Sequence, residues 1–297
     1  MLVLTTVIWG SSFPLVQGAV AHIPPLQFVS WRFALASLCL LPWLRGSGGV
    51  RAAVPGLLVG LANAGGFLLQ TFALQTIGAD QVAFLTGLSV VLVAAGDAVL
   101  VRRRPPAAVL AALAAGVVGL GLMTAGPGLT WSVGDLLGLA CAGLFTLQVL
   151  GTSRLAPRIG GMRLAAQEVL SGAAAFAVTA AVWHPAWLMP PEPSVWPLVA
   201  FMAVVATVGT LGLQSAGQAR VSATAAAVTF NLEPVFATAW AFVLTGESLT
   251  LREGLGAAFV LASMIVAALA PGEAAAAAGA QGALVPAAVG DRQGRGS

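Results

Sequence analysis

Charged residues are scarce in this sequence, and their scarcity decides the class of protein. Asp, Glu, Lys and Arg make up 8% of the 297 residues, whereas a soluble domain carries about a quarter. So few charges cannot cover a surface that faces water, which argues against a soluble globular protein. A disordered chain is also excluded, because it would combine low hydrophobicity with high net charge. These absences leave a polytopic helical membrane protein.

Residues with metal-binding or redox chemistry are few as well. The sequence has two cysteines, Cys39 and Cys141, and two histidines, His22 and His184. Both cysteines fall in apolar runs, and neither has the spacing of a metal or redox motif, so we expect buried free thiols. The sequence therefore predicts neither a metal site nor a cofactor.

Lysine and tyrosine are absent, and all 13 basic residues are arginine. The formal net charge is +3 and the isoelectric point is about 10.1. In a soluble protein such a value would suggest nucleic-acid binding. In a chain this apolar, the arginines are better interpreted by their position relative to a membrane, and we expect no nucleic-acid partner.

Long apolar runs dominate what is present. Hydrophobic types make up 59% of the chain, and the mean hydropathy is +0.95. A helix needs about 20 apolar residues to cross a lipid bilayer. Dividing the sequence at its Arg, Pro and Gly clusters gives ten such runs. They are Leu2–Val20, Leu26–Leu44, Ala52–Thr71, Val82–Val101, Ala107–Ala125, Asp135–Gly151, Leu164–Trp183, Val195–Gln214, Ala223–Leu244 and Gly254–Ala270.

The arginines orient these ten spans. If the N-terminus is cytoplasmic, eleven of the 13 arginines fall on the cytoplasmic side, Arg252 falls in an outer loop and Arg32 lies inside the second span. This distribution follows the positive-inside rule, and one span more or fewer would destroy it. We therefore expect a multi-pass protein of a bacterial inner membrane with both termini in the cytoplasm.

Some helix starts carry local signals. Ser132-Val-Gly-Asp135 before the sixth span and Thr250-Leu-Arg-Glu253 before the tenth fit capping boxes, in which side chains bond the free backbone N–H groups. These signals predict helix boundaries and no chemistry.

The ten spans divide into two halves of five, and because five is odd the halves must lie in opposite orientations. Shifting the sequence by 144 residues brings the fourth and fifth spans onto the ninth and tenth, with several Ala, Leu and Val identities. Inverted repeats of this kind around a central cavity are a recurrent plan of secondary transporters. We predict repeats over residues 1–128 and 129–270, followed by a disordered cytoplasmic tail over residues 271–297.

Several short motifs, in this order, carry a family resemblance. They are Trp9-Gly-Ser-Ser-Phe13, Trp31-Arg32-Phe33, Ser222-Ala-Thr-Ala, Leu232-Glu-Pro-Val235 and Gly246-Glu247. Together they resemble EamA-type proteins of the drug/metabolite transporter superfamily from Met1 to about Ala270. The resemblance implies ten helices, two inverted repeats and export of small metabolites or amino acids. One departure is that Arg102-Arg103 stand where first repeats of the family often carry Gly-Glu.

Polar side chains inside the apolar spans must face protein or water rather than lipid. They concentrate in spans one, three, four, six, seven and nine, whereas spans five and ten are almost bare. We infer that spans five and ten lie at the periphery and that the others enclose a cavity. The candidates for solute binding are Trp9, Ser12, Gln17, Asn63, Gln70, Thr86, Gln148, Asn231 and Trp240.

These candidates also have structural interpretations. Serine and threonine often bond back to their own helix. Trp9 and Trp240 could pack in the core rather than form an aromatic wall. Asn63 lies beside Gly65-Gly66, with Gly56-x-x-x-Gly60 upstream, and could make an interhelical hydrogen bond at a small-residue contact.

Two charged residues inside the spans also have a structural interpretation. Arg32 lies about six residues inside the outer end of its span, and it could either snorkel outward or face the cavity. Asp97 lies about one turn from Arg102 and could pair with it at the inner face.

Glu233 and Glu168 are the candidates for proton coupling or gating, because an ionised carboxylate inside a membrane is costly unless it takes up a proton or faces water. Glu233 precedes Pro234, which frees a carbonyl one turn earlier and can kink the helix at a gate. A static polar contact is the alternative for Glu233. Glu168 lies about one turn into its span and could simply mark the interface.

The sequence favours a secondary transporter that exports a small organic solute by alternating access. A monomer is sufficient for a ten-helix pathway. A membrane scaffold or signalling protein is the alternative, but it does not explain polar residues sorted to selected helices. An intramembrane enzyme is disfavoured, because the sequence has no H-E-x-x-H, G-x-S-x-G or Walker motif.

Overall fold

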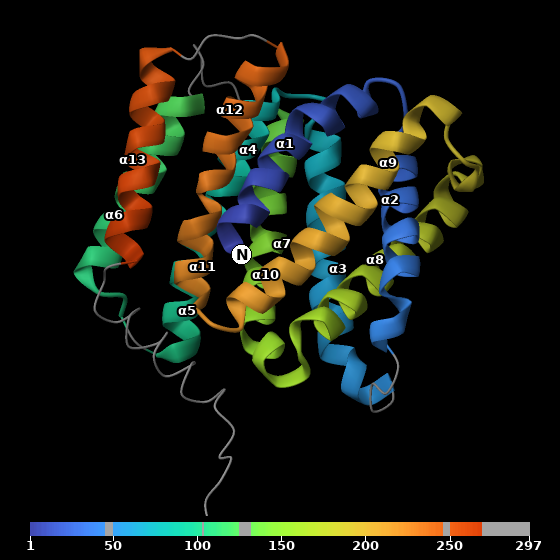
Figure 1. The fold of residues 1–297 in the computed structure, drawn as a ribbon, viewed down its shortest axis with the longest axis horizontal. Coiled ribbons are helices and arrows are strands. Elements are labelled where there is room, and N and C mark those ends of the chain that lie inside the picture. The colour runs from blue at the N-terminus through green and yellow to red at the C-terminus, as the bar shows by residue number, and fades with distance from the viewer. Residues whose placement is uncertain (45–49, 103, 125–131, 246–249, 269–297) are drawn as a thin grey trace, which may run out of the picture.

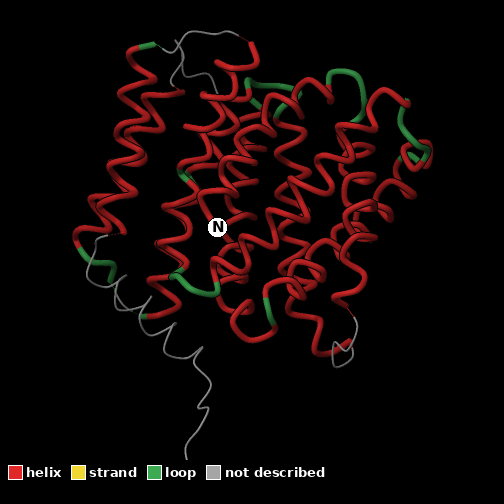
Figure 2. Tube along the Cα trace, viewed as in Figure 1, coloured by secondary structure: helices red, strands yellow, loops and turns green. Residues whose placement is uncertain are grey.

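The computed structural model describes residues 1–44, 50–102, 104–124, 132–245 and 250–268, and this part of the chain contains helices and loops but no strand (Figure 2). The α-helices are α1 (Leu2–Val20), α2 (Pro25–Leu40), α3 (Val50–Ala73), α4 (Ala79–Gly87), α5 (Ser89–Val101), α6 (Ala107–Thr124), α7 (Val133–Ile159), α8 (Gly161–Trp183), α9 (Trp196–Ala203), α10 (Thr210–Gln218), α11 (Ala223–Phe230), α12 (Leu232–Thr245) and α13 (Leu251–Ala268). Short 3₁₀ helices occupy η1 (Leu41–Leu44), η2 (Pro185–Leu188) and η3 (Pro193–Val195), and η4 (Val204–Gly209) is a π-helix.

Seven helical segments in the described part are long and apolar enough to cross a membrane, and two shorter apolar helices lie at Ala107–Gly119 and Gly254–Ser263. An all-helical polytopic membrane protein is therefore confirmed, whereas the count of ten spans stays a prediction. Several predicted features lie outside the described residues, namely the tail after Ala268, Arg45, Arg103 and the Gly246-Glu247 pair.

Three of the predicted spans depart from regular α-helix in their interior, within the described residues. The fourth is divided at Leu88 into α4 and α5, and the ninth is divided at Asn231 into α11 and α12. Pro234 stands in the first turn of α12, where its missing N–H is tolerated and its ring prevents a continuous helix from α11. The departure from regular helix predicted from Pro234 is a one-residue turn at Asn231, whose N–H donates to the Val228 carbonyl at 3.2 Å. The eighth span runs through the π-helical turn η4 between α9 and α10.

The helix boundaries repeat along the chain. Helices begin at Ala79 and Ala107, and helices also begin 144 residues later at Ala223 and Leu251. The separation between the two interruptions, at Leu88 and Asn231, is one residue shorter than this distance of 144 residues.

Figure 1 shows how the helices are arranged. α6 and α13 pack together at one edge, α2, α8 and α9 form the other edge, and α1, α4, α7, α10 and α11 lie between them. The pair α6 and α13 corresponds to the predicted fifth and tenth spans, which places these two spans at the periphery as expected. The central helices surround the candidate site.

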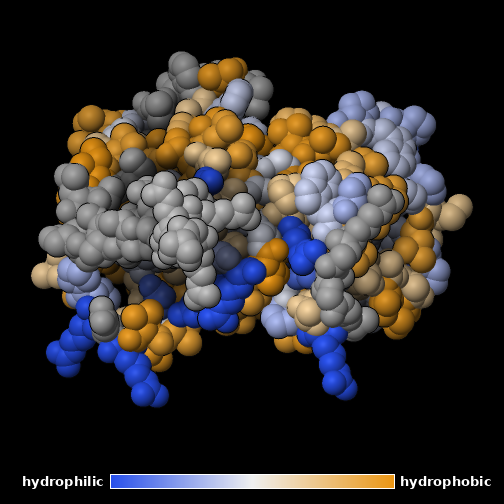
Figure 3. Space-filling model, turned by 60° about the horizontal axis from the view of Figure 1, so that its bottom comes forward, coloured by the Kyte–Doolittle hydropathy of each residue, from blue (hydrophilic) through white to orange (hydrophobic). Residues whose placement is uncertain are grey.

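Arginines gather at one end of the bundle. The connections α5–α6, α7–α8 and α10–α11 lie at this end, and the connections α1–α2 and α3–α4 lie at the other (Figure 1). Figure 3 brings the first end forward and shows hydrophilic side chains projecting from it. The exposed arginines at helix ends there are Arg51, Arg102, Arg104, Arg158 and Arg220. That this end faces the cytoplasm stays a prediction.

Glycines let helix backbones approach closely. A Cβ atom on Gly60 of α3 would lie 2.6 Å from the Glu168 carbonyl oxygen of α8, and one on Gly10 of α1 would lie 2.7 Å from the Ala237 nitrogen of α12. Gly56 faces the Gln167 side chain of α8. The small-residue contact predicted from Gly56 and Gly60 is therefore confirmed, and it joins α3 to α8.

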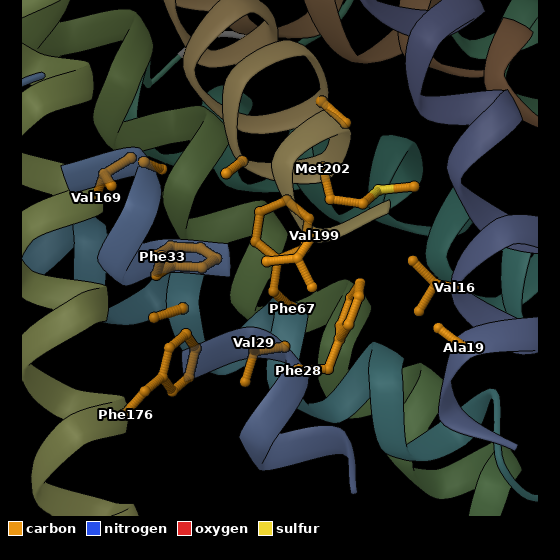
Figure 4. Close-up of a cluster of buried hydrophobic side chains, with 14 of the residues drawn as sticks. Val16, Ala19, Phe28, Val29, Phe33, Phe67, Val169, Phe176, Val199 and Met202 are labelled. Atoms are coloured by element: carbon orange, nitrogen blue, oxygen red, sulfur yellow. The ribbon is translucent and has the colours of Figure 1, made fainter. Parts of the chain in front are cut away.

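The largest apolar cluster lies where α2, α3, α8 and α9 meet (Figure 4). Its aromatic centre is Phe33, whose ring meets Phe67 at 5.6 Å and Phe176 at 5.0 Å in edge-to-face geometry. Such pairs are favourable beyond their buried area. This cluster fixes α3 and therefore the cavity side chains that α3 carries.

Two further predictions can be compared with the structure. Ser132 and Asp135 form the predicted capping box at the start of α7, with the Ser132 N–H donating to Asp135 Oδ2 at 2.7 Å. Both cysteines are free, but only Cys141 is buried. The expected burial of Cys39 is wrong because its side chain projects from the outer face of α2, where lipid would cover it.

Candidate functional site

A cavity lies at the centre of the bundle, where the two interrupted spans meet α1, α3, α7 and α10. Water-molecule centres can occupy about 50 Å³ of it, and one water needs roughly 10–15 Å³ on that measure. The cavity therefore has room for a few water molecules in this conformation. Its lining residues are Trp9, Ser12, Asn63, Phe67, Gln70, Ala83, Thr86, Gly87, Ser89, Phe145, Gln148, Val149, Gln214, Ala227, Phe230, Asn231, Glu233 and Pro234.

Aromatic rings form one part of the wall. The Trp9 ring lies 5.5 Å from that of Phe230, and Phe67 meets Phe145 at 5.3 Å in edge-to-face geometry. The Trp9 indole N–H donates to Thr210 Oγ1 at 3.0 Å. The rings therefore present apolar faces to the cavity, while the polar edge of Trp9 is satisfied by protein.

Amides and hydroxyls form the rest of the wall. Ser12 donates to the Trp9 carbonyl of its own helix at 2.7 Å, so the back-bonding alternative holds for this residue although it lines the cavity. Thr86 Oγ1 lies 3.8 Å from Cys141 Sγ. Asn63 Nδ2 and Asn231 Oδ1 are buried and have no hydrogen-bond partner. The interhelical hydrogen bond considered for Asn63 is thus absent at this nitrogen.

The interruption between α11 and α12 positions three lining residues. Asn231 stands at the break, and Glu233 and Pro234 follow in the first turn of α12. A helix that continued through Asn231 would turn these side chains differently. Among the described residues that line the cavity, Glu233 is the only charged one, and the others supply neutral donors and acceptors and aromatic faces.

Glu168 lies behind the cavity wall, fully buried in α8. Thr152 Oγ1 donates to its Oε1 at 2.9 Å and Gln148 Nε2 donates to its Oε2 at 3.0 Å. Gln148 in turn accepts from Gln214 Nε2 at 3.1 Å. Glu168 is enclosed by α3, α7 and α8, and its position relative to the membrane interface stays a prediction. Gln148 connects it to the cavity.

The structure brings together nine of the twelve predicted site residues. Those nine line the cavity; Gln17, Glu168 and Trp240 do not. Gln17 is half-buried on α1 beyond the cavity. Trp240 donates to the Val7 carbonyl at 3.0 Å and joins α12 to α1, which favours its packing interpretation.

Sequence reasoning missed most of the aromatic wall. Phe67 and Phe145 were not singled out, because phenylalanine in an apolar span is normally a core residue. Helical spacing contains a usable signal, since Phe67 lies between Asn63 and Gln70 on one face of α3, and Phe145 lies one turn before Gln148 on α7. Phe230 is the third phenylalanine of this wall and packs against Trp9.

Two charged residues have partners other than those expected. Arg32 is only 2% exposed and donates from Nε to Thr207 Oγ1 at 2.7 Å, so the snorkelling alternative is wrong, and it does not line the cavity either. Asp97 pairs with Arg154 of α7 at 3.4 Å rather than with Arg102. Sequence distance along one helix does not reveal a neighbour on another helix.

No group of three or more His, Cys, Asp or Glu side chains within the described ranges could hold a metal ion.

Comparisons with known proteins identify the family. The model of the EamA-like transporter family matches residues 1–125 and again residues 132–269. The chain is 28% identical over 275 residues to an uncharacterized transporter of Archaeoglobus fulgidus, covering 90% of this chain and 84% of the relative. A crystal structure with 18% identity superimposes with a TM-score of 0.73 over 90% of this chain and 95% of the other, which is a likeness of fold. The chain therefore belongs to the EamA-like transporter family and is a multi-pass membrane transporter.

Proposed function

We propose that the protein is a secondary transporter that exports small organic metabolites, amino acids in particular, from the cytoplasm. The observation that carries this proposal is the pair of unsatisfied amide atoms in the cavity. Asn63 Nδ2 offers a donor and Asn231 Oδ1 an acceptor, and each residue is at most 2% exposed. A buried polar atom without a partner is unfavourable and indicates a position where a ligand supplies the missing hydrogen bond.

An amino acid has the complementary groups. Its carboxylate accepts from Asn63 Nδ2, and its ammonium group donates to Asn231 Oδ1 and to the nearby carboxyl group of Glu233. The rings of Trp9 and Phe230 then suit an apolar or aromatic side chain. No cation lines the cavity in the described residues, so a dianionic solute would find no charge partner there.

Alternating access is supported by the helix starts that repeat at a distance of 144 residues. We propose inverted repeats over residues 1–128 and 129–270, whose relative rocking opens the cavity to each side in turn. The positions of α4–α6 and α11–α13 support this division. A bacterial inner membrane, cytoplasmic termini, a cytoplasmic tail over residues 271–297 and a monomeric state belong to the same proposal.

Proton coupling through Glu233 and Glu168 completes the proposal. Glu233 lines the cavity beside the Pro234 break, where a change of its charge acts on both the solute and the helix. Glu168 reaches the cavity through Gln148 and Gln214. A proton bound at either carboxyl group removes the cost of an unpaired charge in the membrane and permits rearrangement.

Flux in proteoliposomes tests the assignment. The full chain is reconstituted, and uptake of labelled L-phenylalanine is measured for wild type, Asn63→Leu and Asn231→Leu, with Gln75→Leu as the control amide outside the cavity. Each cavity variant should raise KM about tenfold, which corresponds to roughly one hydrogen bond to a charged group. Flux with an unaltered KM in both variants would refute the site, and no flux of any of a panel of labelled metabolites would favour a scaffold.

The coupling proposal has a separate test. Glu233→Gln and Glu168→Gln are compared with wild type over a range of pH, with flux as the readout. A carboxyl group that carries the coupled proton makes flux depend on pH, and its amide variant should flatten that dependence. An identical pH profile in a variant removes that residue as a proton carrier.

A further inference from the structure

Arg32 is a buried cation that does not line the cavity. It lies in the middle of α2 and is 2% exposed. Among the described residues, no Asp or Glu lies within ion-pair distance of its guanidinium group. A charged residue held inside a membrane protein without a counter-charge is costly and usually has a functional reason. Its neighbours indicate what that reason is.

The acceptors for Arg32 come from the π-helical turn η4. Arg32 Nε donates to Thr207 Oγ1 at 2.7 Å, and Nη2 donates to the Ala206 carbonyl at 3.2 Å. A π-turn pairs its backbone groups one residue further along than an α-helix does, and such turns are frequent at functional sites. Thr207 Oγ1 itself donates to the Met202 carbonyl at 2.7 Å. Arg32 thus binds the turn at two adjacent residues.

The same turn is linked by hydrogen bonds to Trp9 in the cavity wall. Thr210 Oγ1 donates to the Ala206 carbonyl at 2.8 Å, the carbonyl that also accepts from Arg32. Its only hydrogen is then used, and its lone pairs accept the Trp9 indole N–H at 3.0 Å. A continuous chain of hydrogen bonds therefore joins Arg32 to Trp9, which faces the cavity.

Arg32 touches a second aromatic wall residue directly. The guanidinium carbon lies 4.4 Å from the centre of the Phe67 ring, within the range of a cation–π contact. Phe67 also lines the cavity. One buried cation thus orders two of the four cavity rings, Phe67 by contact and Trp9 through Ala206 and Thr210.

We propose that Arg32 is a positioning residue that sets the orientation of Trp9 and Phe67 and thereby determines the preference of the cavity for aromatic solutes. The effect of Arg32 on transport rests on the proposed function. Its effect on the orientation of Trp9 does not depend on transport and can be measured separately. The two measurements below therefore distinguish failure of the Arg32 proposal from failure of the proposed function.

The first measurement is the indole resonance of Trp9 in the full chain labelled with [15N]tryptophan and assigned through Trp9→Phe. Arg32→Met should move this resonance although Arg32 does not touch the indole, and Thr210→Val should move it as well. Arg32→Lys, which restores a cation, should return it part of the way. Thr179→Val is the matched control, because Thr179 bonds only the Ala175 carbonyl of its own helix at 2.8 Å. A Trp9 resonance that stays in place in Arg32→Met overturns the proposal.

The second measurement compares L-phenylalanine with L-alanine in proteoliposomes. Arg32→Met and Thr210→Val should each raise KM for phenylalanine about fivefold, the effect of one hydrogen bond, and leave that for alanine within about twofold. The double variant should be no worse than Arg32→Met alone, because Thr210→Val breaks only the hydrogen-bond chain that Arg32→Met already interrupts, whereas Arg32 also contacts Phe67. Equal losses for the two solutes, or single effects that multiply, overturn the proposal. If wild type carries neither solute, the proposed function fails and the Trp9 resonance alone decides. Should Arg32→Met fail to fold, Arg32→Lys and Thr210→Val give the same comparison.

Discussion

The contact between α3 and α8 allows a quantitative prediction at Gly60. A Cβ atom there would lie 2.6 Å from the Glu168 carbonyl oxygen and closer still to the Glu168 Cα and Ser171 Oγ, whereas ordinary contact begins near 3.4 Å. The helices must therefore separate by about 0.8 Å or more, because backbone atoms cannot rotate away as a flexible side chain can. Gly60→Ala should lower the free energy of unfolding by about 1–3 kcal/mol, the usual cost of overpacking.

A matched substitution at Gly143 should change the free energy of unfolding in the opposite direction. Gly143 of α7 has nothing within 4 Å of the position that its Cβ would occupy. Gly143→Ala should therefore gain helix propensity alone and stabilise the protein by up to about 1 kcal/mol. Gly56→Ala should fall between the two, because the nearest atoms belong to the Gln167 side chain, which can move.

Unfolding of the three variants and wild type would be followed in lipid nanodiscs or bicelles by steric trapping or by denaturant titration. Gly60→Ala should also weaken the contact of Glu168 with Gln148, because it displaces the α8 backbone at Glu168 itself. A Gly60→Ala protein as stable as Gly143→Ala would refute the reasoning, since it would mean that α3 and α8 do not approach as closely as the structure has them.

Three smaller predictions concern helix ends and topology. Ser132→Ala removes a capping hydroxyl from α7 and should lower the free energy of unfolding by about 1 kcal/mol in thermal melts; an unchanged melt would contradict the capping role. Arg154→Gln breaks the pair with Asp97, whose side chains are 36% and 20% exposed, and should cost less than about 1 kcal/mol in the same assay. Arg102→Cys should react with a membrane-impermeant maleimide from the cytoplasmic side, with the native chain as control, and labelling from outside would invert the topology.

The helical architecture was predictable from the sequence for a physical reason. In lipid every backbone N–H and C=O needs an internal partner, so a long apolar run has few structures open to it. The interruption before Pro234 was predictable because proline cannot donate a backbone hydrogen bond. The break at Leu88 has no proline in α5, and the π-turn η4 lies in an ordinary apolar run, Val-Val-Ala-Thr-Val-Gly. Nothing in those residue types distinguishes the turn from regular helix.

The cavity was partly predictable for a similar reason. Polar residues avoid lipid, so Asn63, Gln148 and Asn231 could be placed inside the bundle from their residue type. The partners of Arg32 could not be predicted, because Thr207 is 175 residues away along the chain. The partners of Glu168 could not be predicted either, because a count from the helix start gives depth but says nothing of the helices packed around it.

The π-turn η4 has a consequence for sequence comparison and for engineering. A π-turn amounts to one residue inserted into an α-helix. Deleting one codon within residues 204–209 would remove that extra residue and let a regular helix form with the following residues still on the same face. Gln214 would keep its contact with Gln148, and Gln218 would keep the Val149 carbonyl and the Ser153 hydroxyl, to which it now donates at 3.1 and 2.9 Å. The same deletion in a regular helix would instead rotate everything after it by about 100°. Alignments of relatives should therefore tolerate a single-residue gap in this stretch and not in the regular helices beside it.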